Sequence, residues 1–332
     1  MKNKNWTSRA PGNLFLLGEH SVVYNRKALL TSIGKYTKAE ANERNDEKIH
    51  VKSKGYGEID TTLKELEKIE YEDHEDYENE MDPIKDLLRK YKQEKGLKTG
   101  LNIEISSDIP KESGGMSSST AVLSSVLRIL NKVNEENMMG KEYFKFLLPI
   151  QVKIHGGAAS GSEIMSSTLG GYNTVRKTDE GVKYENISPE KLHIVIGDTG
   201  IEAKTSETVS YVKRGWENHE EPYEEAFDEI EKIVEEGERA IERRNKEKLG
   251  KSMNKNQEKL RILGVSHPKL ESLISASLNA GALGAKLSGG GKGGIMIALT
   301  EEKNQEDVAK AIERKRGRTI TTEIGVRGAK TY

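Results

Sequence analysis

The sequence predicts an α+β fold with two domains. Patterns typical of strands and of helices follow one another in mixed order, rather than in the strict alternation of a β-α repeat, and no segment repeats another. A chain of 332 residues is long enough for one large domain or two ordinary ones. Because the composition changes near residues 175–195, we expect one domain over residues 1–185 and a second over 186–332.

The amino-terminal part contains mainly strand patterns. Residues 14–24 hold two short apolar runs on either side of Gly18-Glu19-His20, which predicts a hairpin or a strand pair with a polar tip. Beyond it, hydrophobic periodicity predicts strands over 27–43, 48–53 and 100–106, a solvated helix or loop over 62–80, and helices over 83–94, 121–133 and 140–154.

The carboxy-terminal part is dominated by one long charged segment. Residues 204–262 are almost wholly helical in pattern, with many Glu and Lys residues spaced to pair on one helix face. Around this segment the patterns predict strands over 171–176, 192–197, 284–288, 294–299 and 318–325, and helices over 268–280 and 303–314.

Composition excludes several classes of protein. The chain has no cysteine, which rules out disulfides, thiolate metal sites and cysteine nucleophiles. Its 53 Lys and Arg residues nearly balance 54 Asp and Glu residues, and its aromatic residues form no stacking platform, so we expect no nucleic-acid partner. It has neither an apolar run of about 18 residues nor a signal-peptide pattern, so we expect no membrane association and a cytoplasmic location.

Three glycine-rich loops are the most informative features. The first, over residues 110–121, lies between a strand pattern and a helix pattern. Backbone N–H groups of such a loop and the helix start behind it can hold a phosphate, although a Gly/Ser turn with a capping hydroxyl has the same appearance. It lacks the Walker A spacing.

The second loop, over residues 286–294, has five glycines between positions 289 and 294. A plain hairpin needs only one or two, so the excess indicates a close approach of the backbone to a ligand or to another loop. The third loop, over residues 155–163, carries a single acid, Glu163, among small residues. That carboxylate could lie beside a substrate hydroxyl, or the loop could simply be a surface loop.

Together with APGNLFLLGEHSVVY at residues 10–24, these loops resemble the signatures of the GHMP kinases, most closely those of the mevalonate kinases within that family. The resemblance covers essentially the whole chain. It implies an amino-terminal ATP-binding domain like the second domain of ribosomal protein S5, and a ferredoxin-like carboxy-terminal domain. It also implies an activity, the transfer of phosphate from ATP with Mg²⁺ to the primary hydroxyl of (R)-mevalonate in isoprenoid biosynthesis.

The resemblance assigns roles to individual residues of this chain. Glu19, His20, Thr205 and Gly289 would contact mevalonate. Ser118 or Ser119 would contact Mg²⁺. The ATP phosphates would be held by Pro110, Gly114, Gly115, Met116, Ser117, Ser118, Ser119 and Thr120.

Three charged positions of the family pattern have changed. Asn13 stands where the family usually has a lysine, Glu163 replaces the aspartate proposed as the catalytic base, and Gln151 replaces a glutamate that binds the metal. We expect Glu163 and Asn13 to be catalytic, with Gln151 as a neutral ligand of Mg²⁺. The changes leave two alternatives open: a GHMP kinase for another small hydroxy acid or a phosphomevalonate-like substrate, and a catalytically impaired nucleotide-binding relative. We also expect a homodimer.

Overall fold

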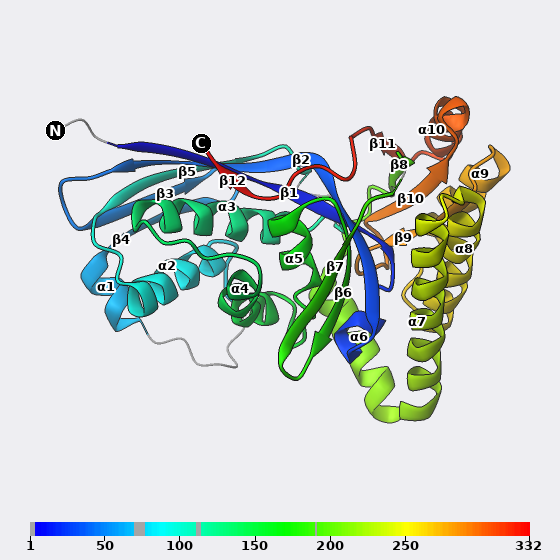
Figure 1. The fold of residues 1–332 in the computed structure, drawn as a ribbon, viewed down its shortest axis with the longest axis horizontal. Helices are drawn as coiled ribbons and strands as arrows, with labels where there is room; N and C mark the ends of the chain where they lie inside the picture. Colours follow the sequence, from blue (N-terminus) through cyan, green and yellow to red (C-terminus); the bar gives the residue numbers. More distant parts are fainter. Residues whose placement is uncertain (1–3, 70–76, 111–113, 190) are drawn as a thin grey trace.

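The computed structural model describes residues 4–69, 77–110, 114–189 and 191–332 (Figure 1). Its larger sheet has the strand order β12-β1-β2-β5-β3-β4, and β6 pairs with both β2 and β7. Only the pairing of β3 with β5 is parallel among the described strands of this sheet. The strands are β1 (Asn5–Leu17), β2 (Lys27–Glu43), β3 (Lys48–Ser53), β4 (Gly57–Thr62), β5 (Leu101–Ser107), β6 (Tyr172–Thr178), β7 (Gly181–Ile187) and β12 (Lys330–Thr331).

Helices cover one face of the larger sheet (Figure 1). Among them α3 packs on β1 and β2 and buries apolar residues of the predicted helical pattern, including Ala121, Val126 and Leu127. This packing fixes the start of α3, which follows the first glycine-rich loop. The helices of this part are α1 (Leu63–Lys68), α2 (Asp82–Lys95), α3 (Ser118–Val133), α4 (Lys141–Ile154) and α5 (Ser162–Leu169).

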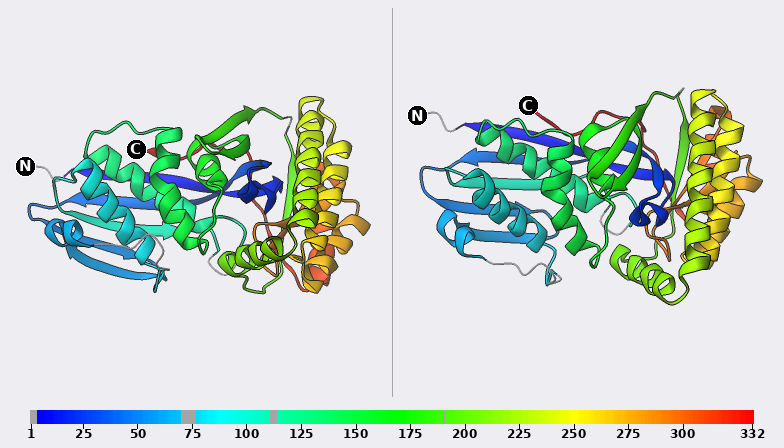
Figure 2. Two further views of the ribbon diagram at one scale, coloured as in Figure 1. Left: turned by 90° about the horizontal axis from the view of Figure 1, so that it is seen from below. Right: turned by 60° about the horizontal axis from the view of Figure 1, so that its bottom comes forward.

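The smaller sheet has the order β11-β8-β10-β9, antiparallel throughout. Numbered along the chain this order is 4-1-3-2, with helices after the first and third strands, and it confirms the expected ferredoxin-like topology. Figure 2 shows its long helices α7 and α8 side by side. The elements are β8 (His193–Asp198), α6 (Thr205–Asn218), α7 (Glu220–Glu242), α8 (Lys246–Ile262), α9 (Pro268–Asn279), β9 (Gly284–Ser288), β10 (Ile295–Thr300), η2 (Glu302–Asn304), α10 (Gln305–Arg314) and β11 (Arg318–Ile320).

The predicted hairpin over residues 14–24 is wrong. Residues 14–17 complete β1, and residues 21–24 form a short 3-10 helix, η1 (Ser21–Tyr24). Between them the chain turns sharply, because Gly18 and His20 both have positive φ, of 93° and 62°. A Cβ at Gly18 would lie 2.7 Å from the carbonyl oxygen of Lys27, so only glycine fits there.

Other differences concern short elements. Helix α5 and strands β4, β7 and β12 are absent from the sequence prediction. The expected strand over 318–325 is a regular strand only as far as residue 320, and the chain then returns to the larger sheet through β12. Of the segment 62–80, residues 63–68 form α1, which begins with a capping box of Thr62 and Glu65. Residues 70–76 of that segment, and 111–113 of the first glycine-rich loop, lie outside the described residues.

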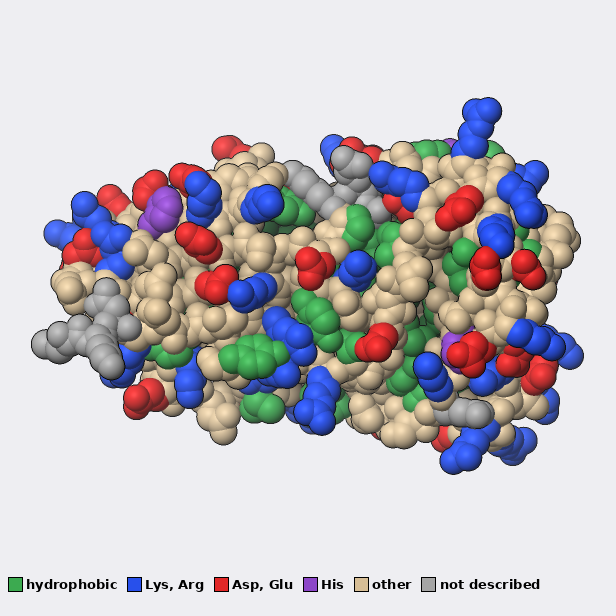
Figure 3. All heavy atoms as spheres, turned by 90° about the horizontal axis from the view of Figure 1, so that it is seen from above, with side chains coloured by type: hydrophobic (Ala, Val, Ile, Leu, Met, Phe, Trp, Pro, Cys, Tyr) green, Lys and Arg blue, Asp and Glu red, His purple; other side chains and the backbone are tan. Residues whose placement is uncertain are grey.

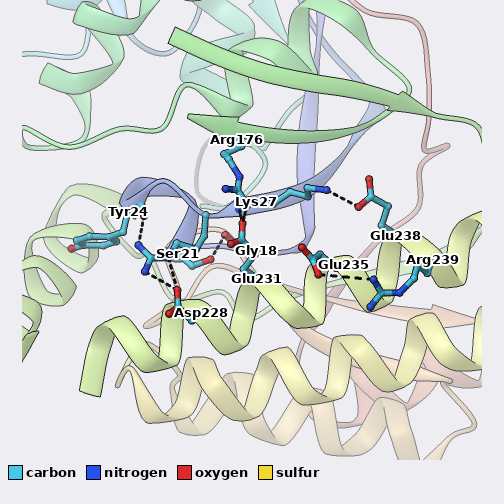
Figure 4. A network of polar contacts seen from close by, with 11 residues as sticks. Gly18, Ser21, Tyr24, Lys27, Arg176, Asp228, Glu231, Glu235, Glu238 and Arg239 are labelled. Carbon is cyan, nitrogen blue, oxygen red and sulfur yellow. Dashed lines mark hydrogen bonds and ion pairs between the residues drawn. The ribbon is translucent and has the colours of Figure 1, made fainter. Parts of the chain in front are cut away.

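A row of ion pairs joins the larger sheet and the turn before β2 to helix α7 of the carboxy-terminal part (Figure 4). The cations lie on the side of the larger sheet: Arg26 directly precedes β2, Lys27 is its first residue, and Arg176 belongs to β6. All three pair with α7. Acidic residues at helical spacing on α7 receive them: Glu224 and Asp228 bind Arg26, Glu231 binds Arg176, and Glu238 binds Lys27. Elsewhere cations and anions are interspersed, as the face in Figure 3 shows.

Helix α8 also bonds directly to backbone groups. Asn254 accepts a hydrogen bond from the N–H of Ala285 at 2.9 Å, and Gln257 accepts one from Leu287 at 3.0 Å. Strand β9 lies at the edge of its sheet, so these N–H groups have no neighbouring strand to pair with. A third amide, Asn256, accepts from the N–H of Gly18 at 2.9 Å and so holds the turn after β1.

Candidate active site

The predicted site residues meet around one cavity of about 140 Å³. Its wall brings together the turn after β1, the starts of α3, α5 and α6, and the second glycine-rich loop. Of the predicted residues it includes Glu19, His20, Gly114, Gly115, Met116, Ser117, Ser118, Ser119, Glu163, Thr205 and Gly289. Asn13, Pro110, Thr120 and Gln151 do not line it.

Three helices begin at this cavity, and two of them, α3 and α6, have no capping side chain. In α5 the N–H of Ser162 donates to the hydroxyl of Ser160 at 3.2 Å. Helix α3 starts at Ser118, α5 at Ser162 and α6 at Thr205, and none of the three N-cap residues makes a side-chain hydrogen bond to its helix. The N-cap residue of α3, Ser117, does not cap the helix with its hydroxyl, so the alternative interpretation of the first loop as a turn with a capping hydroxyl is wrong. Uncapped first turns leave backbone N–H donors and the positive ends of helix dipoles facing the cavity. No lysine or arginine among the described residues lines it.

The two glycine-rich loops lie backbone against backbone, and this contact explains the glycines. At Gly115, where φ is +99°, a Cβ would lie 2.3 Å from the carbonyl oxygen of Ser288. At Gly289 a Cβ would lie 2.6 Å from the Cα of Gly115. The second loop thus supports the first from behind, as the excess of glycine indicates.

We predict that Gly115→Ala separates the two loops. Left-handed backbone costs an ordinary residue about 1–2 kcal/mol, and the clash with Ser288 adds to it. The variant should unfold at a lower temperature and bind ATP more weakly, as thermal denaturation and nucleotide titration can measure. Gly96→Ala is the matched control, because Gly96 has φ of 71° but no atom within 4 Å of a Cβ. Equal effects of both substitutions would contradict the prediction.

Glu163 lies in the first turn of α5 with both carboxylate oxygens bound. The hydroxyl of Ser117 donates to Oε1 at 2.7 Å, and the amide Nε2 of Gln151 donates to Oε2 at 2.7 Å. His155 lies further away, with its Nε2 at 3.9 Å from Oε2. Two neutral donors from different elements therefore fix the orientation of this carboxylate.

Asn13 and Gln151 lie behind the cavity wall. Asn13 is fully buried, its amide donates to the backbone carbonyl of Glu163 at 3.3 Å, and its Oδ1 lies 2.9 Å from the Ser117 hydroxyl. Gln151 is 1% exposed and also donates to the hydroxyl of Thr120 at 3.0 Å. Both residues thus contact Glu163 or its partners. The amide oxygen Oε1 of Gln151 is buried without a hydrogen-bond partner in the described part of the chain.

Glu19 and His20 reach the cavity from the turn after β1. His20 is buried, which lowers its pKa to about 4, so the ring is neutral at neutral pH. Its Nε2 lies 2.9 Å from the carbonyl oxygen of Gly290, and a carbonyl only accepts, so the proton is on Nε2. His20 therefore supplies no positive charge to the cavity at neutral pH.

Glu19 forms a buried ion pair that sequence reasoning missed. Its carboxylate binds Nζ of Lys286, a residue of β9 with no exposed surface. Burial raises the pKa of Glu19 and lowers the pKa of Lys286, and their mutual attraction opposes both shifts. The available signal was a lysine inside the apolar strand GAKLS, because a lysine buried in this way needs a partner.

Two further hollows adjoin the start of α3 and α6. A small one, of about 70 Å³, shares Ser118 and Ser119 with the main cavity and is otherwise lined by Ser53, Tyr56, Glu80, Pro83, Ile84, Val122 and Leu123. An open cleft of about 1100 Å³ runs between the start of α2 and α6, with Lys153, Lys204, Arg214 and Lys292 in its walls. Sequence reasoning assigned no role to either.

Comparison with known proteins identifies the same two-part organisation. The family model for the GHMP kinase N-terminal domain matches residues 82–171, and the model described as GHMP kinases C terminal matches residues 238–319. Mevalonate kinase from Pyrococcus abyssi is 32% identical over 96% of this chain and 95% of its own length. Mevalonate kinase from Thermococcus gammatolerans is 34% identical, over 96% of each chain.

Solved structures agree in fold. The crystal structure of the Methanococcus jannaschii mevalonate kinase superposes with a TM-score of 0.80, at 24% identity, over 98% of this chain and 99% of its own. Two family models match in the order that the sequence predicts, the N-terminal model before the C-terminal one. The curated relatives are more than 30% identical to this chain over nearly its whole length. The chain belongs to the mevalonate kinase family of the GHMP kinases.

Proposed function

We propose that this protein transfers the γ-phosphoryl group of ATP to the primary hydroxyl of (R)-mevalonate, giving 5-phosphomevalonate and ADP. The observation that carries the proposal is the meeting of two uncapped helix starts, those of α3 and α6, and one oriented carboxylate around a single cavity. Phosphoryl transfer depends mainly on positioning and on stabilising the charge of the phosphates, and this arrangement supplies both.

The phosphates of ATP would lie against the first turn of α3. The loop over residues 114–119 presents backbone N–H groups there, and Gly115 allows the close approach that a side chain would block. The small hollow shared with Ser118 and Ser119 has apolar walls, including Tyr56, Pro83 and Val122, that suit the nucleoside base.

The carboxylate of mevalonate would lie at the start of α6. Thr205 contributes to the cavity wall there and is the first residue of the helix, whose N-terminal N–H groups have no capping side chain. An anion needs such donors here because the described cavity wall contains no cationic side chain. His20 is neutral at neutral pH and supplies no positive charge, so the N–H groups at the start of α6 would bind the carboxylate instead.

Glu163 would act as the base. It accepts the proton of the primary hydroxyl, the hydroxyl oxygen forms a bond to the γ-phosphorus, and the bond from that phosphorus to the leaving oxygen of ADP breaks. Ser117 and Gln151 hold the carboxylate while this happens.

Magnesium fits the residues present. The cavity offers the hydroxyls of Ser118 and Ser119 next to the proposed phosphate position, and hard oxygen ligands are those that Mg²⁺ prefers. When bound, the ion would neutralise part of the phosphate charge. The buried, unpartnered Oε1 of Gln151 is a further oxygen near Glu163, but it lies behind the wall rather than in it.

The test is a panel of alcohols incubated with the purified protein and Mg-ATP, with ADP release and ³¹P NMR of the product as readouts. Mevalonate should be phosphorylated on its primary hydroxyl faster than other small hydroxy acids or phosphomevalonate. Faster turnover of another alcohol, or nucleotide binding with no turnover at all, would overturn the proposal.

None of the described helices is both long and apolar enough to cross a bilayer. The division at residue 185, the homodimer and the cytoplasmic location stay predictions.

A further inference from the structure

Lys286 is a buried cation that the proposed reaction does not use. It has no exposed surface, and its Nζ binds Oε1 of Glu19 and the carbonyl oxygen of Leu287. Burying a lysine is costly, and apolar residues of similar size often replace buried ion pairs without loss of stability. The pair therefore needs a reason other than stability.

The second carboxylate oxygen of Glu19 supplies that reason. Oε2 is buried and has no hydrogen-bond partner among the described residues, although Glu19 contributes to the wall of the main cavity. A buried carboxylate oxygen left without a donor is costly, so a donor from a ligand would compensate for it. The same cavity wall contains apolar residues, among them Phe15, Val22 and Val23.

Mevalonate carries a donor of the required kind. Its primary hydroxyl must lie at Glu163 to react, which leaves the tertiary hydroxyl, on the carbon that also bears a methyl group. A hydrogen-bond acceptor beside apolar residues matches that hydroxyl beside that methyl group.

We infer, on the basis of the proposed function, that Lys286 is a positioning residue, which holds one oxygen of Glu19 so that the other accepts a hydrogen bond from the tertiary hydroxyl of mevalonate. Lys286 itself does not touch the substrate, because it is not part of the cavity wall. Its effect passes through Glu19, whose carboxylate would take up a proton if it were buried without a cation.

The test compares two substrates and two variants. The substrates are mevalonate and 5-hydroxy-3-methylpentanoate, which lacks only the tertiary hydroxyl. The variants are Lys286→Met and the double variant Glu19→Leu/Lys286→Met, in which an apolar pair replaces the ion pair and keeps the interior neutral. Lys52→Met is the control, because Lys52 pairs with Glu58 on the surface and lines none of the cavities described above.

Wild-type protein should prefer mevalonate over the analogue in kcat/KM. In both variants the ratio of kcat/KM for mevalonate to that for the analogue should fall at least tenfold. The cause should be a higher KM for mevalonate, while the KM for the analogue stays nearly unchanged. Lys52→Met should keep the full preference. Circular dichroism and thermal denaturation verify that each variant is folded, and the double variant decides the matter if Lys286→Met alone does not fold.

Two results would overturn the inference. One is an unchanged preference in the folded variants, and the other is an equal rise of KM for both substrates, which a merely structural role would produce. Failure of the proposed function gives a different result, because the wild-type protein would then not phosphorylate mevalonate at all.

Discussion

Glu163→Gln should lower kcat for mevalonate by about 10²–10⁴-fold, the range that general base catalysis contributes. The amide that replaces the carboxylate has almost the same size and can still accept from Ser117, so the cavity should keep its shape. It cannot take the proton of the hydroxyl. Steady-state kinetics should therefore show a loss in kcat with little change in the KM for ATP.

Glu163→Asp is the matched variant for this prediction. It restores the residue of the family pattern but shortens the arm that carries the carboxylate. We expect activity between those of the wild-type protein and Glu163→Gln. Near-normal kcat in Glu163→Gln would show that the reaction proceeds by positioning alone and would remove Glu163 from its role as base.

Gln151→Glu should lower kcat at neutral pH by about 10–100-fold. It places a second carboxylate where Nε2 now donates to Glu163 at 2.7 Å, and two carboxylates at that distance cannot both be ionised. One would hold a proton at neutral pH and lose it only at higher pH. The pH–rate profile should therefore rise across a range where the wild-type profile is flat.

The same substitution has the opposite result if Gln151 serves only as a metal ligand. A glutamate would then bind Mg²⁺ more strongly than a neutral amide, and the Mg²⁺ concentration for half-maximal rate would fall without loss of kcat. Gln151→Met is the control, since it removes the donor to Glu163 without adding charge and should cost less than Gln151→Glu. Measuring kcat against Mg²⁺ concentration for both variants distinguishes the two roles.

The sequence was most predictive where the local pattern alone determines the structure. The strand over 284–288 and the helix beginning at 268 were located correctly, because apolar alternation and a proline at the helix start are local signals. The hairpin over 14–24 was wrong because positive φ at Gly18 and His20 redirects the chain, and the apolar residues after it carry no sign of that turn. Helix α5 was missed because its eight residues are mostly small and polar.

Prediction of the site from the sequence was limited in the same way, because local patterns do not show which distant residues meet. Motif resemblance selected most of the residues that line the cavity, although it also selected Asn13 and Gln151, which lie behind the wall. The bond from Gln151 to Glu163 joins two helices across a loop, and the pair of Glu19 with Lys286 joins residues 267 positions apart. Such partners depend on how the two sheets pack together, which no single stretch of sequence specifies.

The amide side chains of α8 have a consequence for the protein's behaviour outside catalysis. An exposed edge strand is a template on which another chain can add a strand and begin to aggregate. Asn254 and Gln257 occupy the donors that β9 would offer to such a strand. The amide protons of Ala285 and Leu287 should therefore exchange with solvent as slowly as those between paired strands, and this edge of the sheet is closed to strand addition for as long as α8 stays folded.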